Sequence, residues 1–255
     1  MKASYHTHTY RCHHADGSDQ QFVEAAIDAG LELLGFSDHM PHPHSAITYD
    51  RMSLEEFPEY LQSIQRLKEQ YRASIEILSA LECEWIADNP DFLYKLKQQC
   101  DYLIFGNHIR LSTQVEYDYT FYANDQALEL YCQESRAALS SGLFLYFAHP
   151  DYFMFGRRNF NEACKRAAHD IAQMAVEFNI PLEINISGFT RSHYIAGKWQ
   201  APYPYPDFWQ IIAQYPVKVV YGLDAHRPIH QFRADMIESI NSHLGNPQFL
   251  VLDRI

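Results

Sequence analysis

The amino-acid sequence predicts an α/β protein whose strands and helices alternate in a distorted (β/α)7 barrel. Two observations support this fold class. Seven short segments are almost continuously apolar, which is typical of strands buried on both faces of a parallel sheet. Amphipathic helical segments separate these strands, and about seven successive strand–helix units favour closure of the sheet into a barrel. An open doubly wound sheet is the alternative, but the sequence contains neither a GxGxxG nor a GxxxxGK[ST] phosphate loop.

The expected strands are rich in aliphatic and aromatic residues. They are SYHTH (4–8), LLGFSDH (33–39), IEILSALECEW (75–85), YLIFGNH (102–108), LFLYFAHP (143–150), PLEINIS (181–187) and VKVVYGLDAH (217–226). Helices are expected at residues 19–30, 53–73, 125–141, 160–179, 206–214 and 229–243. Gly30 suits the position that follows the first helix, and Ser53 with Glu56 forms a capping-box pattern at the start of the second.

The composition narrows the range of functions. The chain has 255 residues, of which 47% are hydrophobic, and this suits one domain over residues 1–255. No apolar run reaches the roughly 18 residues of a membrane span, and the first residues lack the apolar segment of a signal peptide, so we expect a cytoplasmic protein. The net charge of -12 disfavours nucleic acid as a partner. The five cysteines form no CxxC pair, which argues against a disulfide framework or a structural zinc finger.

Metal-binding residue types occur at or near the end of nearly every expected strand. In a parallel barrel the carboxyl ends of all strands meet on one face, so these side chains are expected to converge there. A single histidine at a strand end is usually a polar residue with an ordinary partner, but a repeated pattern along the chain favours a site. The residues are His6, His8, Asp38, His39, Glu82, Glu84, His108, His149, Glu183, Asn185, Asp224 and His226.

The spacing of these residues indicates the kind of metal site. His6 and His8 are two residues apart on a strand, so both rings point to the same side and can bind one ion. Asp224 and His226 repeat that spacing. Histidine and carboxylate ligands without thiolates suit Zn, Mn or Fe, and their number implies two or three divalent ions, an arrangement suited to phosphate esters. Glu82 and Glu84 point the same way, so periodicity does not separate them.

The motifs HTHTYRCHH, GFSDH, LECE, GNH, AHPD and GLDAH resemble the successive motifs of the polymerase-and-histidinol-phosphatase (PHP) superfamily, and most closely its histidinol-phosphate phosphatases. The resemblance extends from His6 to His226. It implies a seven-stranded distorted barrel with three metal ions at the carboxyl ends of the strands. The implied ligands are His6, His8, Glu82 and Asp224 for the first ion, Glu82, His108 and His149 for the second, and His14, His39 and His226 for the third.

The resemblance also selects Glu82 over Glu84 and His14 over His13. Related chains often read CPHG where this chain reads CHHA, so His13 stays an extra candidate for the third ion. The implied catalytic set is Asp38, His39 and His226, in which Asp38 orients His39 or a water that carries a proton.

The resemblance implies hydrolysis of L-histidinol phosphate to L-histidinol and phosphate, in histidine biosynthesis. The expected partner is therefore a small phosphorylated metabolite, with no nucleic acid and no membrane, and the protein is expected to be a monomer or a small homo-oligomer. Arginines that follow the later strands are candidates for phosphate binding, because a guanidinium offers two donors to phosphate oxygens. They are Arg157, Arg158, Arg191 and Arg227.

The segment 196–208 is rich in proline and aromatic residues and is expected either to form a wall of the site or to pack as a rigid loop. Three other functions are weighed. A PHP-type phosphoesterase could act on another small ester or a nucleotide, and a metal-binding scaffold would lack turnover. An amidohydrolase-type barrel ranks lower, because no lysine ends a strand.

Overall fold

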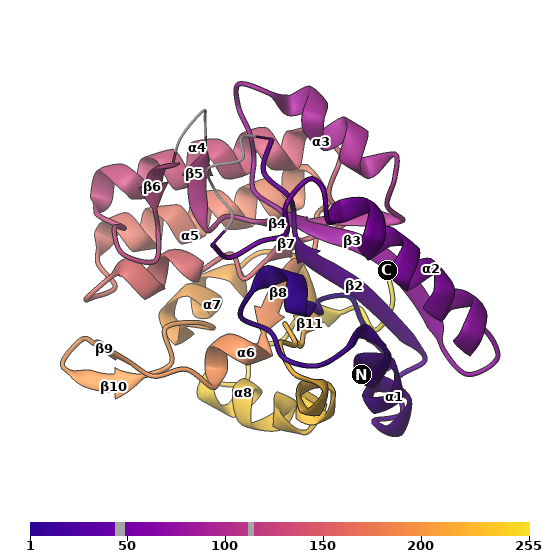
Figure 1. Ribbon diagram of the computed structural model, residues 1–255. Helices are drawn as coiled ribbons and strands as arrows, with labels where there is room; N and C mark the ends of the chain where they lie inside the picture. Colours follow the sequence, from indigo (N-terminus) through magenta and orange to yellow (C-terminus); the bar gives the residue numbers. More distant parts are fainter. Residues whose placement is uncertain (44–48, 112–114) are drawn as a thin grey trace.

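The structure is a computed structural model that describes residues 1–43, 49–111 and 115–255. Within these residues the central sheet has eight strands in the order β1-β2-β3-β4-β7-β8-β11-β12, and all neighbouring strands are parallel. The sheet curls, and the predicted distorted barrel is confirmed (Figure 1). The strands are β1 (Ala3–Ser4), β2 (Leu33–His39), β3 (Glu76–Cys83), β4 (Tyr102–Gly106), β7 (Phe147–Ala148), β8 (Leu182–Asn185), β11 (Lys218–Gly222) and β12 (Leu250–Val251).

Helices cover the outside of this sheet. The α-helices are α1 (Asp19–Asp28), α2 (Phe57–Tyr71), α3 (Pro90–Lys97), α4 (Asp125–Ser140), α5 (Glu162–Glu177), α6 (Ile186–Phe189), α7 (Pro206–Ile212) and α8 (Ile237–His243). Three 3-10 helices follow strand ends: η1 (Tyr10–Cys12), η2 (Tyr152–Gly156) and η3 (Pro228–Met236). Two antiparallel hairpins, β5 (Ile109–Leu111) with β6 (Val115–Asp118) and β9 (His193–Ile195) with β10 (Lys198–Gln200), are insertions that the sequence pattern did not predict. In the described ranges, none of the helices combines the length and the apolar character that crossing a bilayer requires.

Local sequence signals account for the helix ends near the site. Ser18 caps α1 and forms a capping box with Gln21, and Gly30 follows the helix with a φ of 76°. The predicted box of Ser53 and Glu56 also forms, with each backbone N–H donating to the other side chain. However, α2 begins only at Phe57, so the box shapes the turn that precedes the helix.

The barrel closes between the first and the last parts of the chain. Thr7, which follows β1, forms a parallel bridge with Ala225, which follows β11. The His8 N–H donates to the Ala225 carbonyl at 2.9 Å, and the Ala225 N–H donates to the His6 carbonyl at 3.2 Å. This closure lies at the carboxyl ends of the strands and brings residues 6–8 beside residues 224–226.

Apolar side chains fill both sides of the sheet. The larger cluster packs between the strands and the outer helices, and it includes Phe36, Leu81 and Ile184. A second cluster fills the barrel interior at the amino ends of the strands, with Tyr5 and Tyr102 at its centre. Inside the barrel, the carboxyl ends of the strands are occupied instead by ionisable side chains.

Candidate metal centre

Glu82 lies at the centre of the site. It is one residue from the end of β3 and is almost fully buried, with 1% of its surface exposed. Its Oε1 lies 2.7 Å from His149 Nε2 and 3.3 Å from His108 Nε2. Its Oε2 lies 3.2 Å from His39 Nδ1, 3.4 Å from His6 Nε2 and 3.5 Å from His8 Nε2. Each carboxylate oxygen therefore faces a different set of histidines.

Glu84 has another role, although it lies on the same side of the strand pattern. Its Oε1 accepts a hydrogen bond from His108 Nδ1 at 3.0 Å, and both of its oxygens accept from the guanidinium of Arg51. Glu84 thus holds the ring of His108 from behind. The structure places Glu82, and not Glu84, among the converging Nε2 atoms.

The first group of donors is His6, His8, Asp224 and Glu82. His6 Nε2 and His8 Nε2 are 3.2 Å apart, and Asp224 Oδ1 lies 3.1 Å from His8 Nε2 and 3.7 Å from His6 Nε2. Four ligand atoms around one tetrahedral ion with bonds of about 2.1 Å would be about 3.4 Å apart. The observed spacing of 3.1–3.7 Å matches that geometry.

Two further groups adjoin the first. His108 Nε2 and His149 Nε2 are 3.3 Å apart and share Glu82 Oε1. On the other side, His226 Nε2 lies 3.0 Å from His14 Nε2, and donor atoms of His8, His39 and His226 lie within 4.8 Å of one another.

His13 does not join this cluster. It ends η1 with a left-handed φ of 64° and is exposed, whereas the next residue reaches His226. The structure therefore brings His14, and not His13, beside His226.

The protonation pattern fits bound cations. His6 Nδ1 donates to Glu183, His14 Nδ1 donates to the Cys12 carbonyl and His226 Nδ1 donates to the Asp224 carbonyl. A neutral ring that donates from Nδ1 has its lone pair at Nε2. The Nε2 lone pairs of His14 and His226 therefore meet at 3.0 Å, and that of His6 faces His8 Nε2 at 3.2 Å. Among the described residues, the buried Glu82 Oε2 also has no hydrogen-bond donor. Converging lone pairs and a buried unpaired carboxylate oxygen fit divalent metal ions.

Electrostatics keep three of the ligands in the forms that bind metal. Burial opposes the charge on Glu82, but His108 and His6 outweigh it and hold the pKa of that carboxyl well below its ordinary value. Burial and the neighbouring His8 lower the pKa of His39 and of His226 well below the ordinary value. These two rings are therefore neutral near neutral pH, which is the form of imidazole that coordinates metal. For His6, His8 and His108, burial lowers the pKa, but the neighbouring carboxylates outweigh it and raise the pKa above the ordinary value.

Unusual backbone angles and closely packed glycines also occur beside the potential metal ligands. His149 and Asp224 have positive φ angles of 32° and 47°, a region that few non-glycine residues adopt. Gly106 and Gly222 lie on strands beside Glu82 and Glu183, and a Cβ at either glycine would overlap the neighbouring carboxylate. These glycines leave room for carboxylates that lie flat against the next strand.

Asp38 supports His8 from behind. Its Oδ1 lies 3.4 Å from His8 Nδ1 and accepts the His39 backbone N–H at 2.9 Å, while its Oδ2 accepts from the N–H and the hydroxyl of Thr9. Arg11 donates to Thr9 Oγ1 at 3.1 Å and forms two hydrogen bonds of 3.0 Å with Asp19. The side chain of Asp38 therefore contacts the ring of His8, and it touches His39 only at its backbone.

The four predicted phosphate-binding arginines lie in different places. Arg191 lines the cavity that contains the histidine cluster. Arg157 donates to Asp125 and to the Ala123 carbonyl, and Arg158 lines a separate hollow beside them. Arg227 pairs with Asp16 and is 63% exposed. The structure thus brings Arg191 to the cavity and not the other three.

The cavity has a volume of about 270 Å³ and is walled by aromatic side chains. Tyr152 stands edge-on to the ring of His108, with ring centres 4.9 Å apart, and Tyr203 lies 5.8 Å from the ring of His149. Tyr203 belongs to the segment 196–208, so that segment contributes a wall of the site. Tyr49, Asp50, Asp118 and Phe121 complete this wall.

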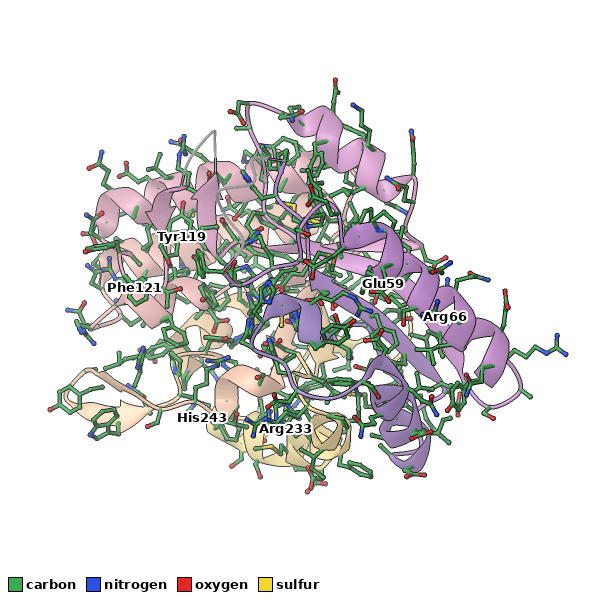
Figure 2. The ribbon with its side chains drawn as sticks, viewed as in Figure 1. Glu59, Arg66, Tyr119, Phe121, Arg233 and His243 are labelled. Atoms are coloured by element: carbon green, nitrogen blue, oxygen red, sulfur yellow. The ribbon has the colours of Figure 1, made fainter. Side chains whose placement is uncertain are left out.

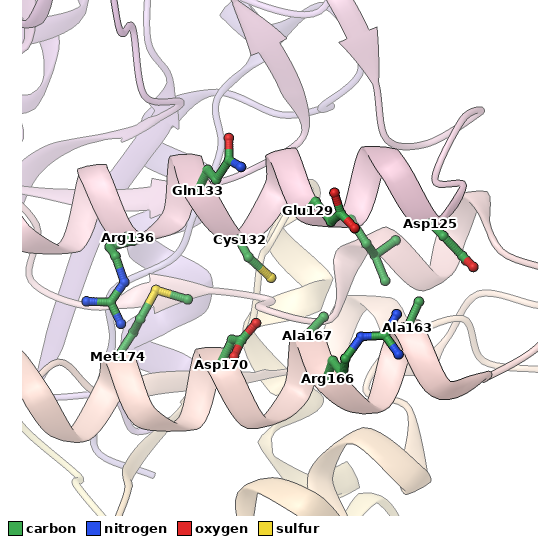
Figure 3. A pocket seen from close by; sticks show the side chains of 11 residues that line it. Asp125, Glu129, Cys132, Gln133, Arg136, Ala163, Arg166, Ala167, Asp170 and Met174 are labelled. Atoms are coloured by element: carbon green, nitrogen blue, oxygen red, sulfur yellow. The ribbon is translucent and has the colours of Figure 1, made fainter.

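A larger hollow, of about 410 Å³, lies between α4 and α5 and away from the histidines (Figure 3). Exposed side chains such as Arg166 and Asp170 line it, together with the apolar side chains of Leu128 and Met174.

Comparisons with known proteins agree with this geometry. The model of the PHP domain matches residues 4–187. A protein of Deinococcus radiodurans named "Probable histidinol-phosphatase" is 29% identical over 235 residues, which are 88% of this chain and 85% of that protein. A protein of the same name from Schizosaccharomyces pombe is 23% identical, over 96% of this chain and 85% of that protein.

Among solved structures, the HisK protein of Listeria monocytogenes matches 93% of this chain and 99% of its own with a TM-score of 0.75 and 17% identity. The histidinol phosphate phosphatase of Lactococcus lactis, solved with zinc, L-histidinol and phosphate, has a TM-score of 0.68 and 18% identity, with 98% and 95% of the two chains covered. At these identities the structures bear on the fold.

Proposed function

Because the chain belongs to the PHP domain family, we propose that it is a metal-dependent phosphomonoesterase that hydrolyses L-histidinol phosphate to L-histidinol and phosphate. The observation that carries this proposal is the cluster of histidines around Glu82, with their Nε2 atoms converging in a cavity that Arg191 also lines. The name of the relative from D. radiodurans, which is aligned over most of both chains, supports this choice of substrate.

Three divalent ions are proposed, one for each group of donors. His6, His8, Glu82 and Asp224 would hold the first, and His108 and His149 would hold the second together with Glu82. His14, His39 and His226 would hold the third. When bound, such ions supply Lewis acidity toward the phosphate oxygens of an ester.

The remaining side chains hold these groups and receive the substrate. We assign Arg191 to the phosphate, because its guanidinium is the cation that reaches the cavity among the four predicted arginines. Asp38 acts as a positioning residue for His8, since its oxygens already accept from Thr9 and from the His39 backbone. His39 and His226, both neutral, lie where the ester would bind and stay in the catalytic set. Tyr152 and Tyr203 narrow the space open to water.

Phosphate-release kinetics with metal content measured on the same sample test this function. L-histidinol phosphate would be compared with a panel of small phosphate esters and nucleotides. The expected result is a kcat/KM for L-histidinol phosphate well above that for every other ester. Equal rates across the panel would contradict the substrate and leave a general phosphatase. A His149→Ala variant with unchanged phosphate release would show that the activity comes from a contaminant.

A further inference from the structure

Two carboxylates line the cavity without belonging to the metal cluster. They are Asp50, which precedes the buried Arg51, and Asp118, the last residue of β6. A cavity that receives a phosphate gains nothing from additional negative charge, because like charges repel at short range. A positive partner would offset the charge of each carboxylate, and the two differ in whether the protein supplies one.

Asp50 already has its partner. Its Oδ1 accepts from Arg51 Nε at 2.9 Å and its Oδ2 accepts from Arg51 Nη2 at 3.3 Å. Both oxygens are engaged, and the guanidinium that engages them is fully buried. Asp50 is thus part of the protein's own ion-pair network with Glu84.

Asp118 has no such partner. Its Oδ1 accepts the Thr120 backbone N–H at 2.9 Å. Among the described residues no cation forms an ion pair with it, and no donor reaches its Oδ2. Asp118 is partly exposed and lines the cavity. One carboxylate oxygen is therefore available to a ligand in the cavity.

The backbone fixes Asp118 beside the second group of metal ligands. Asp118 pairs with Ile109, the residue after His108, and the Tyr119 N–H donates to the His108 carbonyl at 2.9 Å. The hydroxyl groups of Thr120 and Tyr152 form a hydrogen bond of 2.8 Å, and the Tyr152 ring packs against the His108 ring. Tyr119 and Phe121, which follow β6, are labelled in Figure 2 and show where this segment lies.

We propose that Asp118 binds the positively charged amino group of the substrate while the phosphate lies at the metal cluster and Arg191. This inference rests on the proposed function. L-histidinol phosphate carries an anionic ester at one end and a primary ammonium close to it. The cavity offers the opposite charges, with Arg191 and the proposed metal ions for the ester and Asp118 for the ammonium. The aromatic faces of Tyr49, Tyr152 and Phe121 line the same cavity and suit an ammonium and an imidazole.

The experiment compares two substrates that differ only in the amino group: L-histidinol phosphate and 3-(imidazol-4-yl)propyl phosphate. Asp118→Asn is expected to lower kcat/KM for the aminated ester about 10- to 100-fold, the range for loss of a hydrogen bond to a charged group. For the ester without the amine the change is expected to stay within about twofold. The wild-type preference for the aminated ester should disappear in the variant.

Asp50→Asn is the matched control, since it makes the same chemical change in the same cavity at a carboxylate that Arg51 already neutralises. It is expected to change the rates with both esters by the same factor. Equal losses for both esters in Asp118→Asn would overturn the proposal, as would a wild-type enzyme that does not prefer the aminated ester.

Binding of L-histidinol to the metal-loaded protein, measured by calorimetry, tests the same contact without turnover. The proposal predicts affinity at least about tenfold weaker in Asp118→Asn than in wild type. Equal affinities would overturn it. If wild type hydrolyses neither ester, the proposed phosphatase function fails, and the calorimetric comparison still decides whether Asp118 binds the ammonium.

Discussion

The hollow between α4 and α5 and the cavity at the carboxyl ends of the strands both gather ionisable side chains, but they do so in different surroundings. Along α4 and α5 the charged groups are exposed and lie near opposite charges, as where Arg136 pairs with Glu177 at 2.8 Å with both about half exposed. In the barrel cavity His8 and Glu82 are each 1% exposed, and several polar atoms have no partner among the described residues.

This difference shows that burial marks the functional cavity better than size does. The exposed hollow is larger, at about 410 Å³ against about 270 Å³. Water solvates the charges of the exposed hollow, so they need no other partner. Buried carboxylates and imidazoles lose that solvation, and a fold keeps them where a ligand compensates for the loss. The barrel cavity is therefore expected to depend on bound cations, whereas the hollow between the helices is not.

The largest effect is expected from Glu82→Gln. Because each carboxylate oxygen faces a different set of histidines, the amide is expected to remove a negative ligand from two ions at once. The rate of phosphate release should fall by roughly 10³-fold or more, the scale of removing an electrostatic group from a transition state. Elemental analysis should find fewer ions per chain than in wild type. A variant with full activity and a full set of ions would contradict the placement of Glu82 at the centre.

Removal of metal by a chelator should lower the melting temperature by roughly 10 °C, since ions that bind only the folded state at a thousand times Kd stabilise it by about 4 kcal/mol. The physical reason is the return of repulsion among buried ligands such as Glu82 and Asp224. Differential scanning calorimetry with and without chelator measures the shift, and Glu82→Gln should show a smaller one. An unchanged melting temperature after verified loss of the ions would mean that the cluster is stable without them.

Much of this site could be predicted from sequence because parallel strands end on one face. The apolar run LLGFSDH became β2 over Leu33–His39 as expected, and the motif residues at other strand ends came together as well. The separation of Glu82 from Glu84 could not come from periodicity. It depends on Arg51, which reaches Glu84 from a segment more than thirty residues away.

The sequence alone could not predict which of the four arginines reaches the cavity. An arginine that follows a strand is expected near the carboxyl-end face of the barrel. A carboxylate outside the cavity can nevertheless bind its guanidinium and keep it away from the cavity. Arg157 is bound by Asp125, and Arg227 pairs with Asp16 at the surface. Asp118 was missed because its hairpin is a short antiparallel insertion after His108 and leaves no helix or strand period to detect. The strand expected at 143–150 is only Phe147–Ala148 in the structure. The neighbouring strands β4 and β8 pair with it over only one or two residues, which the sequence pattern does not reveal.

A smaller effect is expected from Glu84→Gln, which changes a residue behind the cluster. The amide weakens the charge-assisted hydrogen bond that orients His108, and such changes typically cost 10- to 100-fold in metal affinity. Titration of metal-free protein with Zn²⁺ or Mn²⁺ should show weaker binding of one ion. Asp101→Asn is the matched control, because Asp101 accepts from Ser79 in the middle of β3, the strand that Glu84 follows. Equal weakening in both variants would mean that stability of the sheet, and not orientation of His108, sets the affinity.

The smallest effect is expected from Asp170→Asn in the hollow between α4 and α5. Asp170 is exposed, so water solvates its carboxylate, and surface substitutions of this kind usually change the free energy of unfolding by less than about 0.5 kcal/mol. Metal content should equal that of wild type, and kcat/KM for L-histidinol phosphate should stay within about twofold. A tenfold loss of activity with the metals intact would show that this hollow communicates with the barrel cavity. Burial of ionisable side chains would then not be enough to distinguish the functional cavity from a hollow without function.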